Sequence, residues 1–431
     1  MRIIVWGINY SPELTGIGPF NAGLCDFLVE GGHQVQMVTA FPYYPFWQKI
    51  PGDHGRLFRT ENFDGVTVHR CWHYVPEKAT TLRRIWHELS FALTSFCRVL
   101  FLARPDLYIV VSPPLMLGPL VSIMARLKRR RYVFHVQDLQ PDAAVGLGMV
   151  KPGLFARLLY RLEGWAYRDA ALVSGISDGM MAAFARKGVP EAKRLLFPNW
   201  IRSAARNAEY RPVAHEREDG GRAFREKFGI PQNTFLAAYS GNLGRKQGLE
   251  TLVATAGILE RALTGKAPHT SAPDIMILLV GDGAMRQALL DQIAALGLKH
   301  AIRMLPLLID RDYRGMLAAS EICLVTQAPG TGQFFFPSKL LSVLSAGTPV
   351  LSVADEDSEL ARAVADGRFG VNVLPANPSA LADTLRTLAE DQPRLAQMRT
   401  NTAWVARFSA SRVLGGFEQK LLELTGENRR G

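Results

Sequence analysis

The stretch Tyr239–Glu250, YSGNLGRKQGLE, joins the end of an apolar run to the start of a helical one. The run before it, Phe235–Ser240, has the composition of a buried strand. Glycines between a strand and a helix let the backbone approach a ligand, and free amides at a helix start favour phosphate. Arg245 and Lys246 add cations of the kind that neutralise a leaving diphosphate. The stretch therefore predicts a phosphate-binding turn in an α/β sheet, and a solvated surface loop is the alternative.

Strands and helices alternate on both sides of this stretch, which predicts doubly wound α/β domains with parallel sheets. In the first half we expect strands at Arg2–Gly7, Gln34–Thr39, Val66–Arg70, Leu107–Val111, Arg131–Val136 and Ala171–Gly175, and helices near Pro19–Glu30, Arg83–Ala103, Leu115–Leu127, Phe155–Asp169 and Gly179–Lys187. In the second half we expect strands at Phe235–Ser240, Ile275–Val280, Arg303–Leu305, Ile322–Thr326 and Val350–Val353.

A polar, charged segment separates the two predicted domains. Residues 203–222 contain a proline and paired glycines, and we interpret them as a linker. The first Rossmann-like domain is then expected at 1–202 and the second at 223–407. A last helix within 408–431 is expected to pack back on the first domain. Two domains are the natural expectation for a chain of 431 residues.

The composition is ordinary for a globular protein, with 48% hydrophobic and 21% charged residues and a net charge of +11. The positive excess favours an anionic partner, such as nucleotide phosphate, anionic lipid or nucleic acid. The sequence has no interleaved aromatic platform for bases, so no nucleic-acid partner is expected. Because the four cysteines are far apart and no signal-peptide pattern opens the chain, a cytoplasmic location fits best.

Two features concern a membrane. Leu107–Ala125 is 19 residues without a charge, but Pro113–Pro114 interrupts it, so we interpret it as a strand, a turn and a helix. The predicted helix Arg83–Ala103 is broadly apolar and carries Trp86, and the basic run Lys128–Arg131 follows. These features predict peripheral association with an anionic membrane surface, and a core helix with a wet basic edge is the alternative.

Two motifs follow predicted strands of the first half. Gly16 and Gly18 lie between the first strand and its helix, where they favour phosphate, and a plain tight turn is the alternative. His135 and Asp138 belong to HVQD at the end of Arg131–Val136, and ligands of open α/β sheets bind at such strand ends. We expect His135 to hydrogen-bond a reacting group and Asp138 to orient it. A buried histidine satisfied by the backbone is the alternative.

Two further motifs lie in the second half. Gly281 and Asp282 close the strand Ile275–Val280 in a second backbone-approach turn. Ser338 is expected to cap a helix whose positive end faces a diphosphate, and Lys339 adds a cation there. A capped core helix with an exposed lysine is the alternative.

The acidic triplets Asp310–Asp312 and Asp355–Asp357 are expected to be solvated charge, so we expect no metal. The sequence has no GxxxxGK[ST], GxSxG or HExxH motif, which argues against a P-loop nucleotidase, an α/β-hydrolase and a zinc protease.

With these residues the chain resembles glycosyltransferase family 4, and within it the WcaI-type enzymes of colanic-acid and other exopolysaccharide pathways. The resemblance is near full-length. Its markers are GINYSPELTGIG (7–18), PYYP (42–45), HVQD (135–138), GLGM (146–149), FPNW (197–200), YSGNLGRKQGLE (239–250) and PSKL (337–340).

The resemblance implies a GT-B fold, in which two Rossmann-like domains face each other across a cleft. It implies a retaining, metal-independent transferase that binds a nucleotide-sugar donor mainly on the second domain and a lipid-linked glycan acceptor on the first. By matching motifs, Gly16 and Gly18 would face the donor diphosphate, His135 would sit beside the transferred sugar, and Gly241 belongs to the donor turn.

The chain departs from the family pattern at four positions. The usual Arg and Lys for the diphosphate fall near Asn242 and Gln247, so Arg245 or Lys246 is expected to substitute. The usual two Glu eight positions apart fall on Phe334 and Ser342, and neither is acidic. Glu359 is the candidate for part of that donor-binding role.

Three functions are compatible with these residues. An active transferase is the first, with the leaving phosphate itself acting as base toward the acceptor hydroxyl. The missing Glu pair motivates the second, a catalytically silent glycosyltransferase-like binding subunit. A nucleotide-sugar epimerase on the same two-domain plan is the third. The oligomeric state is not predicted.

Overall fold

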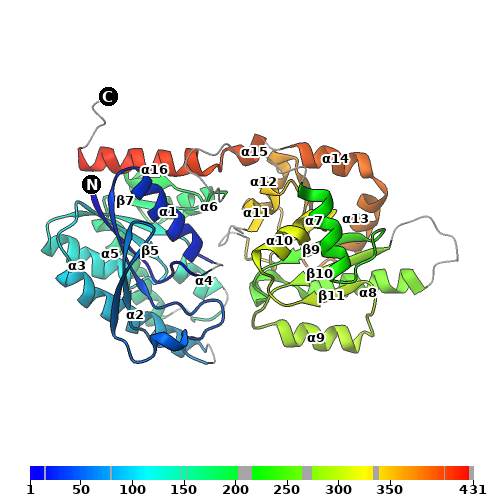
Figure 1. The fold of residues 1–431 in the computed structure, drawn as a ribbon, viewed down its shortest axis with the longest axis horizontal. Coiled ribbons are helices and arrows are strands. Elements are labelled where there is room, and N and C mark those ends of the chain that lie inside the picture. The colour runs from blue at the N-terminus through cyan, green and yellow to red at the C-terminus, as the bar shows by residue number, and fades with distance from the viewer. Residues whose placement is uncertain are drawn as a thin grey trace. The chain divides into compact units, whose positions relative to one another are not determined.

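The computed structural model describes residues 1–13, 16–77, 80–146, 148–151, 153–201, 216–264, 274–332, 339–401 and 403–426. The chain divides into two compact units (Figure 1). Unit 1 is Met1–Ala208 together with Ala410–Gly431, and unit 2 is Glu209–Ser409. Each is a parallel-dominated sheet with helices on both faces.

Unit 1 has an eight-stranded sheet in the order β3-β4-β2-β1-β5-β6-β7-β8. Its strands are β1 (Arg2–Trp6), β2 (Gln34–Ala40), β3 (Phe58–Phe63), β4 (Val66–Cys71), β5 (Leu107–Ser112), β6 (Arg131–Val136), β7 (Leu172–Gly175) and β8 (Arg194–Leu196). All neighbours pair in parallel except β3 and β4, which are antiparallel. The order changes direction at β1, because β2 and β5 flank it, and ligands of open α/β sheets bind at such a point.

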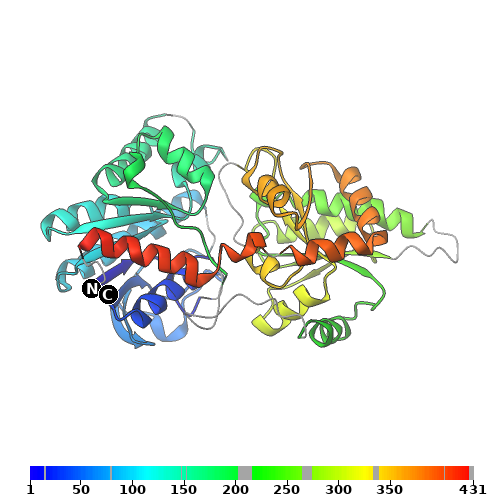
Figure 2. The ribbon, with the colours of Figure 1, turned by 90° about the horizontal axis from the view of Figure 1, so that it is seen from above.

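The helices of unit 1 bury apolar side chains against both faces of this sheet. They are α1 (Gly18–Glu30), α2 (Thr81–Phe101), α3 (Leu117–Leu127), α4 (Gln140–Gly146), α5 (Leu154–Asp169), α6 (Asp178–Arg186) and α16 (Ala410–Thr425), with 3-10 turns η1 (Pro51–Asp53) and η2 (Glu191–Lys193). One core lies under α2, α3, α5 and α6, and the other under α1 and α16. Figure 2 shows α16, in red, lying along unit 1.

Unit 2 has a six-stranded parallel sheet in the order β11-β10-β9-β12-β13-β14. Its strands are β9 (Phe235–Ser240), β10 (Ile275–Val280), β11 (Ile302–Leu305), β12 (Ile322–Thr326), β13 (Val350–Val353) and β14 (Gly370–Val373). Its helices are α7 (Glu216–Lys227), η3 (Arg245–Gln247), α8 (Glu250–Thr264), α9 (Arg286–Ala295), α10 (Asp310–Ala319), α11 (Lys339–Ser345), α12 (Glu359–Gly367), α13 (Pro378–Glu390), α14 (Gln392–Thr400) and α15 (Ala403–Ala406). The central strands are mostly apolar and buried along nearly their whole length, as expected of a sheet covered on both faces.

The structure differs from the predicted linker in its second part. Residues 202–215 lie outside the described ranges, but Glu216 onward forms α7. Gly221 serves a helix contact, because a Cβ there would lie 3.1 Å from the backbone of Ala318 at the end of α10, whereas a Cβ on Gly220 would meet nothing within 4 Å. The buried Arg225 guanidinium donates to the carbonyl oxygens of Pro231, Thr234 and Ala319. This polar, glycine-containing segment therefore forms a helix that packs on α10, and Gly221 allows the close approach.

The uncharged stretch Leu107–Ala125 forms β5, a turn through Pro113–Pro114 and most of α3, as predicted. Among the helices that the structure describes, none is long and apolar enough to span a bilayer.

Candidate active site

The carboxyl edge of the unit 2 sheet carries two turns that lie backbone against backbone. Gly241 begins the turn after β9 with φ +142°, and Gly281 begins the turn after β10 with φ +144°. A Cβ on Gly281 would lie 1.9 Å from the Gly241 carbonyl oxygen, so only glycine fits. The Leu243 amide donates to the Asp282 carbonyl oxygen at 2.8 Å, and the Asp282 side chain is exposed. The contact between the two turns is therefore enough to explain why residue 281 is glycine, without a bound ligand.

A buried ammonium group lies beside these turns. Lys339, the first residue of α11, places Nζ 3.7 Å from the centre of the Tyr239 ring and 3.0 Å from the point that a Gly241 Cβ would occupy. Within the described residues this shielded Nζ has no hydrogen-bond partner. Burial, together with the nearby charge of Lys246, lowers the pKa of Lys339 from 10.5 to about 7. Because a buried cation without a hydrogen-bond partner is unfavourable, the position suits an anion that a ligand brings.

Tyr239 is a site residue that sequence reasoning missed. Its ring supports the Lys339 ammonium, and its hydroxyl donates to the Asn242 carbonyl oxygen at 2.8 Å. The hydroxyl thereby fixes the turn that the ammonium faces. The available signal was an aromatic residue next to the end of a strand that feeds a glycine turn.

The other predicted donor groups of this turn differ in their surroundings. Arg245 is exposed, whereas Lys246 is half-buried and its carbonyl oxygen accepts from the Ala328 amide at 2.9 Å. Asn242 is exposed, and the Gln247 Oε1 atom is buried with no hydrogen-bond partner among the described residues. The structure thus brings Lys246 close to Lys339 and leaves Arg245 at the surface.

Three predicted donor residues belong to α11, α12 and the segment before α11. Ser338 lies outside the described residues, so its role as a cap stays a prediction. Ser342 is exposed on α11, and Glu359 is half-buried in the first turn of α12. Ser358 caps α12 by accepting from the Ala361 amide at 3.1 Å.

The two acidic triplets have structural partners. Asp310 pairs with Arg314 at 2.8 Å, and Asp312 pairs with Lys227 at 2.7 Å. The Asp355 carboxylate accepts from the backbone amide of residue 330 at 2.8 Å. In the part of the chain that the structure describes, no three His, Cys, Asp or Glu side chains are grouped so that they could hold a metal ion.

In unit 1, His135 lies inside β6 with its ring buried. The Gln137 Nε2 amide donates to His135 Nε2 at 2.8 Å, which leaves Nδ1–H to donate to the Ser174 hydroxyl at 3.0 Å. Gln137 is held in turn by a reciprocal amide pair with Asn199. Burial lowers the pKa of His135 to about 3, so the ring is neutral. Side chains, and not the backbone of the alternative interpretation, provide the hydrogen-bond partners of both ring nitrogens. A sugar would have to displace Gln137 to reach Nε2.

Asp138 and the two glycines of the first loop complete the predicted set. Asp138 is half-buried in the turn between β6 and α4. A Cβ on Gly16 would lie 3.2 Å from the Tyr44 ring, and one on Gly18 would lie 3.2 Å from a carboxylate oxygen of Glu13. Both glycines therefore make room for neighbouring side chains, and their contact with a diphosphate stays a prediction.

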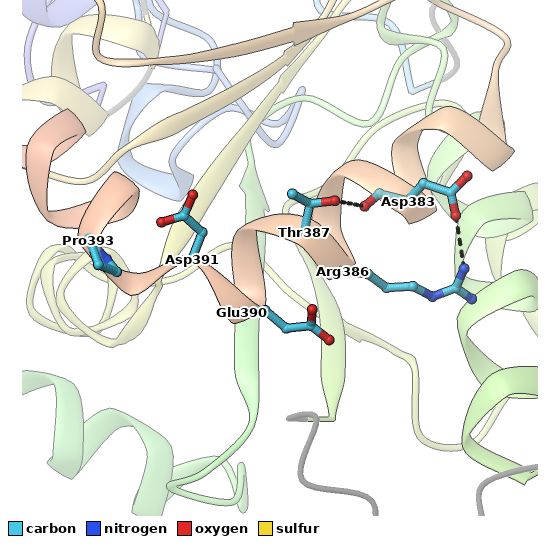
Figure 3. Close-up of a pocket in the computed structure, with 6 residues that line it drawn as sticks. All are labelled: Asp383, Arg386, Thr387, Glu390, Asp391 and Pro393. Carbon is cyan, nitrogen blue, oxygen red and sulfur yellow. Dashed lines mark hydrogen bonds and ion pairs between the residues drawn. The ribbon is translucent and has the colours of Figure 1, made fainter.

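A surface pocket of unit 2 lies where α13 meets α14 (Figure 3). It is lined by Asp383, Arg386, Thr387, Glu390, Asp391 and Pro393. Arg386 pairs with Asp383 at 3.0 Å, and the Thr387 hydroxyl donates to the Asp383 carbonyl oxygen (Figure 3). Three carboxylates against one paired cation disfavour a diphosphate, so this pocket is not a candidate donor site.

Comparison with known proteins follows the same division of the chain. Residues 15–200 match the glycosyl transferase 4-like domain, and residues 222–404 match the glycosyl transferases group 1 domain. A protein of Escherichia coli K12 named as a colanic acid biosynthesis glycosyl transferase, WcaI, is 34% identical over 366 residues. That match covers 84% of this chain and 85% of the relative.

Solved structures show the same fold at lower identity. Sucrose-phosphate synthase from Thermosynechococcus elongatus aligns with a TM-score of 0.74 at 17% identity, over 99% of this chain and all of that one. Anabaena HepE in complex with UDP-glucose aligns with a TM-score of 0.67 at 17% identity, over 98% of this chain and all of that one. From the two domain matches and the near full-length relative we conclude that this chain belongs to glycosyltransferase family 4 and has the GT-B fold.

Proposed function

We propose that this glycosyltransferase is a retaining, metal-independent enzyme of exopolysaccharide or cell-surface polysaccharide synthesis. It moves a sugar from a nucleotide-sugar donor to a polyprenyl-diphosphate-linked glycan. The observation that carries the proposal is the Lys339 ammonium, which is buried beside the Gly241 turn with no hydrogen-bond partner among the described residues. A donor diphosphate is the anion that this position suits.

The chain's own groups suit a reaction at a leaving diphosphate. The bond from the anomeric carbon to the diphosphate oxygen breaks, and the acceptor oxygen bonds to the same face of the sugar. The acceptor proton passes to the departing phosphate oxygen. Lys339 and Lys246 oppose the charge that grows on that oxygen, which is where preorganised cations lower a barrier most.

The relatives support the substrate classes of the proposal. The E. coli relative is named for colanic acid biosynthesis, and the HepE structures contain UDP or UDP-glucose. A structural neighbour at 16% identity, WaaG, is described as involved in lipopolysaccharide biosynthesis. We infer a nucleotide-sugar donor and an acceptor glycan that grows on a membrane lipid.

We expect sugar transfer to depend on the acceptor, to persist in excess EDTA and to retain the anomeric configuration. The assay offers a panel of nucleotide sugars with a lipid-linked glycan extract, and NMR of the product reads the configuration. A reaction without acceptor that alters the donor sugar would indicate an epimerase. Nucleotide binding with no turnover under any pairing would indicate a silent subunit. Activity lost in EDTA and restored by Mg²⁺ would contradict the metal-independent chemistry.

The outer face of α2 supports a membrane location for the acceptor step. Leu82, Trp86, Leu93 and Leu100 are exposed at spacings of four, seven and seven residues, which places them on one side of the helix. The opposite side of α2 packs on the sheet through Phe91 and other buried residues. An exposed apolar stripe with basic residues nearby is typical of a helix that lies in a lipid interface. We propose that this face binds the inner surface of the plasma membrane.

Exposed basic residues lie on and just after α3, which packs against α2, and on α5, which packs against α3. They are Arg126 and Arg129 at the end of α3, and Arg157, Arg161 and Arg168 on α5. Each basic residue near an anionic surface contributes roughly 1 kcal/mol, and added salt weakens that attraction.

The double variant Trp86→Ser/Leu93→Ser is expected to lower binding to anionic liposomes about tenfold or more, because two exposed apolar side chains no longer enter the interface. Sedimentation at low and high salt measures this. Leu296→Ser is the matched control, since Leu296 of unit 2 is 53% exposed and Leu93 is 59% exposed. The outer face of α2 is not the membrane-binding surface if both variants bind anionic liposomes equally well. The same holds if the wild type binds neutral liposomes as well as anionic ones.

A further inference from the structure

The carboxyl group of Glu13 ties two loops together at the carboxyl edge of the unit 1 sheet. Glu13 follows β1 and is only 6% exposed. One carboxylate oxygen accepts from the amides of Tyr43 and Tyr44 at 3.3 and 3.2 Å. The other accepts from the Asn9 side-chain amide at 2.8 Å. One side chain thus holds the backbone of the segment that follows β2 against the loop that follows β1.

The segment held by Glu13 presents aromatic side chains. The half-buried Tyr44 ring lies against Gly16, and the half-buried Trp47 ring lies 5.5 Å from the Tyr43 ring. The Arg84 guanidinium of α2 lies over the Trp47 ring at 5.5 Å. Flat aromatic faces flanked by a few polar groups are what binding sites for small organic ligands commonly offer.

Burial makes this carboxyl group costly in its charged form. It raises the pKa of Glu13 from 4.5 to about 7, although Asn9, the two tyrosine amides and the Arg70 guanidinium favour the charge. An acid with a raised folded pKa contributes stability below pH 4.5 that is lost as the pH rises through 7. Glu13 therefore occupies a position where burial disfavours its charged form. Groups with such perturbed pKa values concentrate at functional sites.

We propose that Glu13 is a positioning residue that fixes the Tyr43–Tyr44 backbone, so that Tyr44 and Trp47 form a rigid aromatic platform for the acceptor saccharide. The inference rests on the proposed transferase function. The ionised carboxylate accepts all three donors at once. A proton on the oxygen that faces Asn9 opposes that amide's N–H, so protonation loosens the platform.

The first test compares Glu13→Ala with Glu13→Gln in acceptor kinetics. Alanine leaves two buried backbone amides without an acceptor, so kcat/KM for the acceptor is expected to fall about tenfold or more, while KM for the donor is unchanged. Glutamine keeps an oxygen for both amides and is expected to stay within about threefold of the wild type at pH 6. The ratio of acceptor kcat/KM in the wild type to that in Glu13→Gln is expected to increase as the pH rises through 7, because both proteins share the Lys339 titration and only the wild type has the Glu13 carboxyl group.

The second test needs no turnover and uses 5-fluorotryptophan. The chain has seven tryptophans, and Trp47→Phe assigns the Trp47 resonance. We expect this resonance to titrate with a midpoint near pH 7 in the wild type and not in Glu13→Gln. The His87 ring lies 5.2 Å from Trp47, but burial lowers its pKa to about 4, so it does not titrate in this range.

Glu88→Gln is the matched control. Burial raises the pKa of Glu88 to about 7 as well, but Glu88 accepts from Gln140 and not from the tyrosine amides. The control should keep the Trp47 titration. An unchanged titration in Glu13→Gln, or a folded Glu13→Ala with wild-type acceptor kinetics, would overturn the proposal. If the Trp47 titration is lost in Glu13→Gln but the wild type transfers no sugar, Glu13 still fixes the Tyr43–Tyr44 backbone, and the transferase function is refuted.

Discussion

Lys339→Met is expected to lower kcat and kcat/KM for the donor by about 100-fold or more, with the fold intact. The ammonium of Lys339 faces the Gly241 turn from a position shielded from solvent, where an electrostatic contact with a growing charge is worth most. Because the same ammonium also attracts the diphosphate of the bound donor, kcat/KM is expected to fall further than kcat, and the difference reports the lost donor affinity. Steady-state kinetics and a thermal melt of the same samples measure the effect.

The stability of the Lys339→Met variant separates this role from a structural one. Burial holds the pKa of Lys339 at about 7, so between pH 7 and 10.5 the unfolded chain binds more protons than the folded one. The lysine therefore weakens the fold at neutral pH, and an apolar side chain of similar length is expected to keep or raise the melting temperature. Arg245→Met is the control, because Arg245 is exposed and solvent screens its charge. Turnover is expected to fall less than tenfold in that control. If Lys339→Met keeps a near wild-type kcat, the donor diphosphate is bound by other residues.

Gly281→Ala is expected to be the most disruptive single substitution in unit 2, with about 4 kcal/mol or more of unfolding free energy lost. Its Cβ would lie 1.9 Å from the Gly241 carbonyl oxygen, so the two turns must separate. The turn that faces Lys339 would move with them, and donor affinity should fall in any protein that still folds. Denaturant unfolding measures the loss.

Gly297→Ala separates backbone strain from this steric clash. Gly297 also has a positive φ, +64°, but a Cβ there would meet nothing within 4 Å. The control is expected to lose only about 1–2 kcal/mol, which is the cost of left-handed backbone for a residue with a Cβ. Equal losses in the two variants would show that the turns are not in contact as described.

Much of the fold could be predicted because long apolar runs alternate with amphipathic helices. Strands such as Ile275–Val280 are buried along their whole length, and the predicted bounds agree with the structure. The edge strand β3, Phe58–Phe63, was missed because its side chains are mostly exposed and polar, so no apolar run marks it. The short edge strands β8 and β14 gave too few residues for a pattern.

The site was harder to predict, because partners that lie far apart in sequence decide what each residue does. His135 occupies a strand that the sequence indicated, but its hydrogen bond to Ser174 depends on the register of β6 and β7, and the distant Asn199 holds the Gln137 amide that occupies Nε2. Lys339 and Lys246 were both predicted as cations of the site. Only the folded chain shows that the Lys339 ammonium is shielded from solvent and that Tyr239 supports it.

The most direct test of the donor site is proton uptake on donor binding. The tightest-binding nucleotide sugar from a thermal-shift panel is titrated calorimetrically at pH 7 in buffers of different ionisation enthalpy. Because Lys339 has a pKa of about 7 in the free protein, a bound diphosphate should favour its charged form, and the complex should take up about half a proton. We expect this uptake in the wild type, and its loss together with weaker binding in Lys339→Met. Wild-type affinity and the same proton uptake in Lys339→Met would contradict the assignment of Lys339 to the donor diphosphate.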